Sequence, residues 1–512
     1  MDKPVDIAII GSGIACTATL IEIYRHLLAS QLPQKLSITV IEKHQEFWKG
    51  VPYGSRSSPN SLTITSIKDF FRSDEESNEF FSWFKPKQDE LIADYRQKGG
   101  FAAEQWLQDN LDALRKEDWD HVYLPRYIVG IYIEEKLAEL RQLTEGKQFA
   151  ALNLITGEAT EVFKADDCFN IEVELANGST TVQAKKIVVA IGSSPERKLT
   201  DRFDDPDSPV IYINNPYQPS FEDNLARIEA ELKGLKNFDE RNILVVGSNA
   251  SSIELLYLIN NNIKLKEQIN RIVLLSTGGK LPYHILYDDS NEPCVNLEEI
   301  KLKAHYTLEE LIDAAIRDIK PTANGQICIP YIDRVVGLTL NLLQPLGEEA
   351  MKRFYGIHGT QLARLFRRSG MDYKKASECL LQSGKLKLEK GGFVDLRQMG
   401  DLALLKYKDT GTREVQEYQL PFKVIINCSG SDDLQNSSSK LIRSLIEKHN
   451  CKVNLSNKAF EVNEKFEAAS GIYVIGPLIG GNMNKLIHFW HLENASRIMY
   501  LAPFLAKELL NV

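Results

Sequence analysis

Apolar runs of strand length alternate with helically spaced apolar positions along this chain. Near the amino end, Val5–Ile10 is almost entirely apolar, and Leu20, Ile23 and Leu27 recur at helical spacing after it. This pattern predicts a strand, a tight turn and a helix. The next apolar run, 36–41, predicts a second strand that ends at an acidic residue. The residues of the turn are Gly11, Ser12, Gly13, Ile14 and Ala15.

The glycine turn has the chemistry of a dinucleotide site. Its first glycine allows the tight turn, its second lets the backbone approach a pyrophosphate, and the amino end of the helix stabilises negative charge. Glu42, at the end of the second strand, is placed to accept hydrogen bonds from an adenosine ribose, and Lys43 adjoins it. We therefore predict dinucleotide binding; the alternative is a tight turn without a ligand. Cys16 replaces the usual third glycine or alanine, and we expect it to pack between helix and strand.

Two further strands end at a glycine after a β-rich stretch. The first stretch has four strand-like segments between 151 and 183, and the apolar strand after it breaks at Gly192. The second apolar strand, 424–428, breaks at Gly430. Such a break brings bare backbone close to a cofactor. We therefore include Ala190, Gly192 and Gly430 among the predicted cofactor contacts.

A second strand, turn and helix lies between these two breaks. Its strand is 242–246, its helix includes 251–256, and another strand follows at 271–275. Asn249 replaces the middle glycine; Asn tolerates positive φ, but its side chain takes space that a pyrophosphate would use. The unit is therefore either a working nicotinamide site or a relic. Its predicted contacts are Gly247, Ser248, Asn249 and Ala250, with Ser276 and Lys280 after the next strand. Hydroxyls and a cation at that last position favour NADP over NAD.

The composition is that of a globular, enzyme-sized chain. Its 512 residues suggest two or three compact units, and 43% hydrophobic with 26% charged residues excludes a disordered chain. The 61 Lys and Arg against 70 Asp and Glu give a net charge of −9, which argues against nucleic-acid or membrane partners. Seven scattered cysteines without a Cys-x-x-Cys pair exclude a redox dithiol. We see no signal peptide and no membrane-length apolar run, so we expect a cytoplasmic protein of undetermined oligomeric state.

Several motifs together resemble a known family. They are Gly11-Ser12-Gly13 with Glu42, Gly50-Val51-Pro52-Tyr53, Ser61-Leu62-Thr63, Leu124-Pro125-Arg126-Tyr127, Ala190-Ile191-Gly192, Val246-Gly247-Ser248, Leu281-Pro282-Tyr283-His284, Asn427-Cys428-Ser429-Gly430 and Ile475-Gly476-Pro477-Leu478. The chain resembles the bacterial FAD/NAD(P)-binding flavoproteins, which have two dinucleotide-binding domains and are related to the flavin-dependent N-hydroxylating monooxygenases. The resemblance covers most of the chain.

The resemblance implies an α/β fold with two Rossmann-like dinucleotide-binding domains, β-meander crossovers and a helical insertion. It implies that the first motif binds FAD, that the Gly247 region binds NADPH, and that Gly476, Pro477 and Leu478 with a helix over 484–509 close over the flavin. Two departures stand out. Many relatives have Asp where this chain has Pro477, and an Arg where it has Ser276 and Thr277. The first pyrophosphate site is therefore the more secure of the two.

We predict two interleaved domains. Residues 1–200 and 431–512 form the FAD-binding domain, because its closing segment lies at the carboxy end of the sequence. Residues 201–430 form the NAD(P)-binding domain, with a helical insertion at about 291–384. Helical spacing marks 297–319 and 347–383 in that insertion and 69–143 in the first domain.

Three other side chains have two interpretations each. Arg126 either meets the pyrophosphate or a substrate carboxylate, or forms a salt bridge. Trp48 and Tyr53 either line the flavin pocket or pack against the domain. We include all three among the predicted cofactor contacts.

Other polar side chains have weaker assignments. His488 and His491, expected on the closing helix, are either a proton donor near the flavin or ordinary packing residues, and a metal site there lacks a third ligand. Arg364, Arg367 and Arg368 form a basic patch on a predicted helix, which we interpret as a solvated face; the alternative is an anion site. No side chain is assigned as catalytic, because in flavoproteins the cofactor carries the difficult chemistry.

The leading functional hypothesis is an FAD-dependent oxidoreductase, specifically an NADPH-dependent flavin monooxygenase that hydroxylates a small molecule. A second hypothesis is a flavin-binding partner or sensor protein without nicotinamide turnover, which the Asn249 substitution motivates. A third is an oxidase or dehydrogenase that takes hydride directly from its substrate.

Overall fold

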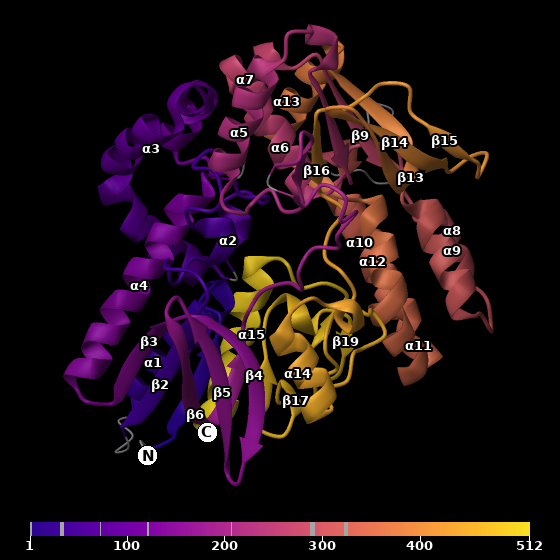
Figure 1. Ribbon diagram of the computed structural model, residues 1–512. Coiled ribbons are helices and arrows are strands. Elements are labelled where there is room, and N and C mark those ends of the chain that lie inside the picture. The colour runs from indigo at the N-terminus through magenta and orange to yellow at the C-terminus, as the bar shows by residue number, and fades with distance from the viewer. Residues whose placement is uncertain are drawn as a thin grey trace.

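Two separate β-sheets organise the chain, each with helices packed on it (Figure 1). The computed structural model describes residues 3–30, 35–71, 73–119, 122–205, 207–286, 292–321 and 326–511. The two ends of the chain lie in the same unit, at the bottom of Figure 1. Within the described ranges, no helix combines the length and the apolar character that a membrane span requires.

The first sheet is built around the amino-terminal strand. Its order is β17 (Glu467–Ala469), β18 (Ile472–Val474), β6 (Gly178–Val189), β1 (Val5–Ile10), β2 (Leu36–Glu42) and β3 (Ala150–Thr156), and the meander strands β4 (Glu158–Ala165) and β5 (Cys168–Leu175) join it at β6. The strands from β18 to β3 are parallel. Ile9 pairs with Val40 and Val188, and all three are fully buried. Strands covered on both faces are therefore continuous apolar runs in the sequence.

The second sheet repeats this plan. Its order is β15 (Val415–Glu417), β14 (Leu402–Asp409), β13 (Leu386–Met399), β9 (Arg271–Ser276), β8 (Asn242–Val246), β16 (Val424–Asn427) and β7 (Ile211–Ile213). The strands from β13 to β7 are parallel, whereas β13, β14 and β15 form an antiparallel meander. In the first sheet, β1 leads into the glycine turn and lies between β2 and β6, the strand that precedes Gly192. In the second sheet, β8 leads into the glycine turn and lies between β9 and β16, the strand that precedes Gly430.

Helices cover both sheets and link the two units. On the first, α1 (Ile14–Ser30) packs against α15 (Ala495–Leu510) and α4 (Arg126–Gly146). The long helix α3 (Asp74–Lys116) is broken at Gly100, where the backbone has φ 55° and ψ −132°. On the second, α6 (Ala250–Asn261) packs against α13 (Met371–Gln382). The remaining helices of the two units are α2 (Gly50–Tyr53), α5 (Phe221–Gly234), α7 (Ile263–Gln268) and α14 (Lys440–His449).

The helical insertion has a hydrophobic core of its own. It contains α8 (Val295–Lys301), α9 (Leu308–Asp318), α10 (Ile329–Leu343), α11 (Glu348–Arg353), a π-helical turn (Phe354–His358) and α12 (Gly359–Leu365). Helix α10 lies between the two segments for which helical spacing was predicted. It contains Pro330, which occupies the first turn, where proline is tolerated. A small parallel sheet of β11 (Gln326–Cys328), β10 (Tyr283–Leu286) and β12 (Arg368–Ser369) joins this insertion to the second unit. The side chain of His284 lies outside the described residues.

The carboxy-terminal helix begins later than the sequence predicts. The prediction of a helix over 484–509 is wrong at the amino end, because α15 starts at Ala495. The side chain of Asn494 caps this helix by accepting a hydrogen bond from the Ser496 amide. The preceding residues form the short hairpin of β19 (Asn482–Met483) and β20 (His488–Phe489) and a loop. His488 and His491 are therefore not on a helix.

Both glycine turns depend on close backbone contact with the neighbouring strand break. Gly11 has φ +92°, and a Cβ there would lie 2.6 Å from the carbonyl oxygen of Ala190, just beyond β6. Gly247 has φ +107°, and a Cβ there would overlap the carbonyl of Cys428, just beyond β16. Only glycine combines this left-handed backbone with so small a volume.

Replacing Gly247 with Ala should destabilise the second unit, because the methyl group meets backbone that cannot move aside. We expect a loss of about 1–3 kcal/mol in the free energy of unfolding, measured by urea titration. The control is Gly337→Ala in α10, where nothing lies within 4 Å of the added Cβ. It should be neutral or gain about 0.5–1 kcal/mol from helix propensity. Equal effects of the two substitutions would contradict the close-contact interpretation.

Candidate functional site

The first glycine turn is held closed by the acidic residue at the end of β2. One carboxylate oxygen of Glu42 accepts hydrogen bonds from the Ser12 amide at 2.8 Å and the Ser12 hydroxyl at 2.9 Å, and the other accepts from the His44 amide at 3.0 Å. Glu42 is buried. The structure thus brings Gly11–Ala15 and Glu42 together, as predicted, and shows that the carboxylate also has a structural task.

The predicted residues after Glu42 have individual partners. Lys43 is exposed, and its Nζ forms an ion pair with Glu158 at 3.0 Å. The carbonyl of Trp48 accepts a hydrogen bond from Thr17 at 2.7 Å, which ties this loop to α1. Tyr53 is buried, with its ring edge-on to that of Phe70 at 6.2 Å between centroids. These contacts agree with a packing role for the two aromatic residues, and their contact with a flavin stays a prediction.

The carboxy-terminal glycine segment lies over the start of α1. A Cβ on Gly476 would be 3.5 Å from the Cβ of Ala15, and Leu478 is buried in the core. The Ile475 amide donates to the Val189 carbonyl at 3.1 Å, so the segment begins beside the strand break that contains Ala190 and Gly192. Gly476 therefore meets the first turn at Ala15, whereas no contact of Pro477 or Leu478 with that turn is seen among the described residues, and their contact with a flavin stays a prediction.

The second turn differs from the first at its middle position. Asn249 is the N-cap residue of α6 and has φ −87°, so the left-handed backbone that its sequence position suggested is not adopted. Its side-chain oxygen accepts a hydrogen bond from the Arg367 guanidinium. A Cβ on Gly430 would lie 3.6 Å from the side-chain amide nitrogen of Asn249. The turn residues Gly247, Ser248, Asn249 and Ala250 thus lie beside the strand break at Gly430, with Arg367 added from the helical insertion.

The residues after β9 form a compact turn. The Gly279 amide donates to both the carbonyl and the hydroxyl oxygen of Ser276 at 3.1 Å. Lys280 donates to the Tyr283 hydroxyl at 2.6 Å, and its Nζ lies 4.9 Å from the centre of that ring. Their proposed contact with a 2′-phosphate stays a prediction.

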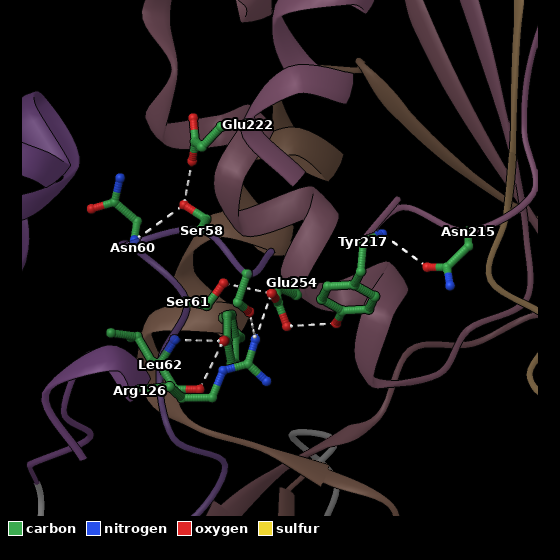
Figure 2. Close-up of polar contacts among 11 residues, drawn as sticks. Ser58, Asn60, Ser61, Leu62, Arg126, Asn215, Tyr217, Glu222 and Glu254 are labelled. Carbon is green, nitrogen blue, oxygen red and sulfur yellow. Dashed lines mark hydrogen bonds and ion pairs between the residues drawn. The ribbon is translucent and has the colours of Figure 1, made fainter. Parts of the chain in front are cut away.

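A buried ion pair joins the two units (Figure 2). Arg126, the first residue of α4, contacts Glu254 of α6 at 2.6 Å, with side-chain exposures of 13% and 3%. The same guanidinium nitrogen donates to the Ser57 hydroxyl at 2.8 Å. Burial alone would lower the pKa of Arg126, but the Glu254 charge and nearby tyrosines raise it above its usual value. The salt-bridge interpretation of Arg126 is confirmed, and its contact with a cofactor stays a prediction.

Loop 57–62 of the first unit meets three helices of the second (Figure 2). The hydroxyl of Ser61 donates to Glu254 on α6 at 2.5 Å, and that of Ser58 donates to Glu222 on α5 at 2.5 Å. The Leu62 amide donates to the hydroxyl of Tyr373 on α13 at 3.0 Å. Tyr217 completes the network by donating to the second oxygen of Glu254 at 3.0 Å.

The sequence analysis missed Glu254 and Tyr217. One signal was available: Glu254 is a lone acid in the apolar run of α6, and a buried carboxylate requires a counter-charge or hydrogen-bond donors. The partner could not be named, because Arg126 lies 128 residues away in the chain.

His491 lies in a positively charged neighbourhood. Burial lowers its pKa to about 4, and the charges of Arg497 and Arg367 act in the same direction, so the imidazole is neutral at neutral pH. His488 is exposed. The part of the chain that the structure describes contains no group of three or more His, Cys, Asp or Glu placed to hold a metal ion.

Comparison with known proteins identifies the family. The sequence profile of the FAD-NAD(P)-binding proteins matches residues 8–194, which include the first turn, the meander and the break at Gly192. Uncharacterized proteins of Mycobacterium bovis and Mycobacterium tuberculosis are 35% identical to the chain over 512 residues, covering 99% of it and 95% of each relative. The chain belongs to the FAD-NAD(P)-binding family. The predicted resemblance is thereby confirmed, as is the pairing of FAD with a nicotinamide cofactor at the level of the family.

Solved structures show the same fold as this FAD-NAD(P)-binding protein. The ornithine N-hydroxylase of Kutzneria sp. 744, with reduced FAD, NADP+ and L-ornithine, has a TM-score of 0.55 at 14% identity and covers 99% of both chains. The FAD-bound cadaverine monooxygenase of Erwinia amylovora has a TM-score of 0.56 at 12% identity, covering 100% of this chain and 95% of its own. The predicted α/β fold with two Rossmann-like domains is confirmed.

Replacing Glu254 with Gln should destabilise the protein, because Arg126 then stays buried without its counter-charge. We expect the free energy of unfolding to fall by about 3–5 kcal/mol in urea titration. The double variant Arg126→Gln/Glu254→Gln should recover part of this loss. Glu117→Gln is the control, because its pair with Lys85 has side-chain exposures of 54% and 46%. It should cost less than about 1 kcal/mol, and an equal cost at both sites would contradict the role given to Glu254.

The stability of the protein should fall with acid in a way that depends on His491. Because its pKa is about 4 when folded and 6.5 in the usual environment, the unfolded chain binds more protons between these values. Stability is therefore lost as the pH falls through this window. Comparing unfolding at about pH 7.5 and about pH 5, His491→Asn should lose about 1–3 kcal/mol less than the wild type. The exposed His488→Asn variant should behave like wild type; the same change in both variants would refute the assignment.

Proposed function

We propose that the protein is an FAD-dependent oxidoreductase in which NADPH reduces the flavin, and that it acts as a monooxygenase that hydroxylates a small molecule. Family membership supports the pair of cofactors. The shared fold with N-hydroxylating monooxygenases supports the reaction class, because those relatives act on ornithine and cadaverine. Small amines are accordingly the first substrates to test.

One observation carries the proposal: two strand–glycine–helix turns, each pressed against a second strand break. A side chain at Gly11 would collide with the backbone of Ala190, and one at Gly247 would collide with the backbone of Cys428. This bare backbone at a helix amino end suits a pyrophosphate. We assign the turn at Gly11, with the segment at Gly476, to FAD, and the turn at Gly247, with Gly430, to NADPH.

The domain boundaries follow from the same assignment. Residues 1–200 and 431–512 would hold FAD, because they contribute every strand of the first sheet. Residues 201–430 would hold NADPH, because they contribute every strand of the second. The helical insertion at about 291–384 would cover the space between the cofactors and exclude water.

The protein's own groups bind, orient and shield in this proposal. When bound, FAD supplies the redox chemistry that no side chain offers. The amide groups of Gly13, Ile14 and Ala15 would face phosphate oxygens, because those of Gly11 and Ser12 already donate to Ile41 and Glu42. Glu42 has lone pairs left for a ribose hydroxyl. The ion pair of Arg126 and Glu254 would fix the orientation of one cofactor unit relative to the other.

One observation favours the second candidate, a flavin-binding protein without nicotinamide turnover. The Asn249 side chain and the Arg367 guanidinium hydrogen-bonded to it lie at the second turn. Asn249 occupies the position of the middle glycine of the dinucleotide-binding motif. An arginine at this place attracts phosphate as readily as it fills space, so we favour the working site.

Anaerobic titration of the FAD-loaded protein with NADPH tests the proposal. We expect the visible flavin band to bleach, and subsequent oxygen with an amine substrate to give hydroxylated product. Asn249→Gly separates the two candidates: reduction slowed by about tenfold or more shows that Asn249 and Arg367 serve a working site. Faster reduction shows that the side chain obstructs the site. A band that persists in wild type at high NADPH would rule out the NADPH-driven reaction.

A further inference from the structure

Four arginines gather where the helical insertion meets the carboxy-terminal segment. Arg364 lies in α12, Arg368 in β12 and Arg367 in the short connection between them, and Arg497 lies in the first turn of α15. We call them the arginine cluster. The charge of Arg364 acts on Arg367, and the charge of Arg368 acts on Arg497. The four side chains therefore share one electrostatic neighbourhood.

The arginine cluster lies between the two glycine turns. On one side, Arg367 donates to Asn249 of the second turn. On the other, Arg497 donates to the carbonyl of His491 at 3.2 Å, and the Cα of His491 would lie 3.2 Å from a Cβ on Gly480. Gly480 ends the segment that starts at Gly476 above the first turn. Ligand sites often form at such junctions between domains.

In the part of the chain that the structure describes, the positive charge of the arginine cluster has no ion-pair partner. Among the residues that the structure describes, no carboxylate lies within ion-pair distance of the cluster; the charges of Glu493 and Asp333 act on it only from farther away. Arg367 and Arg497 are half-buried, and burial with a neighbouring arginine lowers the pKa of each. Half-buried charges without partners are costly.

Two further features indicate that an anion is the missing partner. Arg497 stands in the first turn of α15, where the helix dipole disfavours a cation and favours an anion. Its guanidinium also lies over the rings of Phe489 and Trp490, at 5.5 and 5.9 Å from their centres, which orients it. A ligand with oxyanion acceptors would complement these guanidinium donors.

We propose that Arg367 and Arg497, with Arg368 at the edge, form a subsite for an oxyanion between the two dinucleotide sites. This inference rests on the proposed function, because it assigns the subsite to a ligand of the same reaction. The chemistry suits either a carboxylate of the organic substrate or a phosphate of the nicotinamide cofactor. The first source would make the substrate an anionic or zwitterionic molecule, such as an amino acid, in contrast to a simple amine.

Thermal unfolding of the FAD-loaded protein tests the subsite without requiring turnover. The probes are inorganic phosphate, glutarate and NADP+, each titrated at constant ionic strength. In wild type we expect at least one probe to raise the melting temperature with a saturating dependence. In Arg367→Gln and Arg497→Gln the concentration for half the effect should rise by about tenfold or more. Arg497→Lys, which keeps the charge, should restore part of the response.

The matched control is Arg227→Gln, an exposed arginine of α5 that loses the same charge. It should respond like wild type. Stabilisation by glutarate that the cluster variants lose, with NADP+ unaffected, identifies a substrate carboxylate; parallel losses with phosphate and NADP+ identify the cofactor. The proposal is overturned if no probe stabilises wild type, or if the cluster variants and Arg227→Gln respond alike. Because the readout is melting, a failed flavin reduction by NADPH leaves this result interpretable.

Discussion

A buried ion pair between Arg126 and Glu254 links the two units of the structure. Glu254 lies in the second turn of α6, the helix whose amino end forms the second glycine turn. Its partner Arg126 opens α4, which packs on α1, the helix that starts at the first glycine turn. The pair therefore connects the two predicted cofactor sites through rigid helices. An apolar contact of the same size would bury as much surface but would fix the direction less well, because hydrogen bonds to a carboxylate are directional.

The network around this pair also explains why loop 57–62 is ordered against the second unit. The Ser61 hydroxyl and the Leu62 amide contact buried groups on α6 and α13, whereas Ser58 contacts the exposed Glu222 on α5. Breaking one member leaves the others unsatisfied, so the contacts act together. The interface is thus specified by polar groups, and the buried Glu254 at its centre lies on the apolar helix α6.

The fold could be predicted largely because its core strands are buried on both faces. Such strands are apolar runs, and the glycines at their ends are fixed by local backbone geometry, so both sheets and both turns were recognisable. Local signals failed where a neighbour distant in sequence decides the structure. Helix α10 is stabilised by the core of the insertion despite Pro330 and Gly337, and the start of α15 is set by the Asn494 cap.

The site shows the same limit in electrostatic terms. The arginine triplet at 364–368 has the sequence of a solvated helix face, and its significance appears only when Arg367 meets Asn249, 118 residues away. A chain with a net charge of −9 has many carboxylates that could neutralise arginines, yet none forms an ion pair with this group among the described residues. A local group of positive charges attracts anions, whereas the rest of an acidic protein surface repels them. Burial, together with this positive charge, lowers the pKa of His491 and keeps it neutral at neutral pH. The charge at the junction of the two units is therefore best understood as part of a binding site, in which a ligand supplies the missing negative charge.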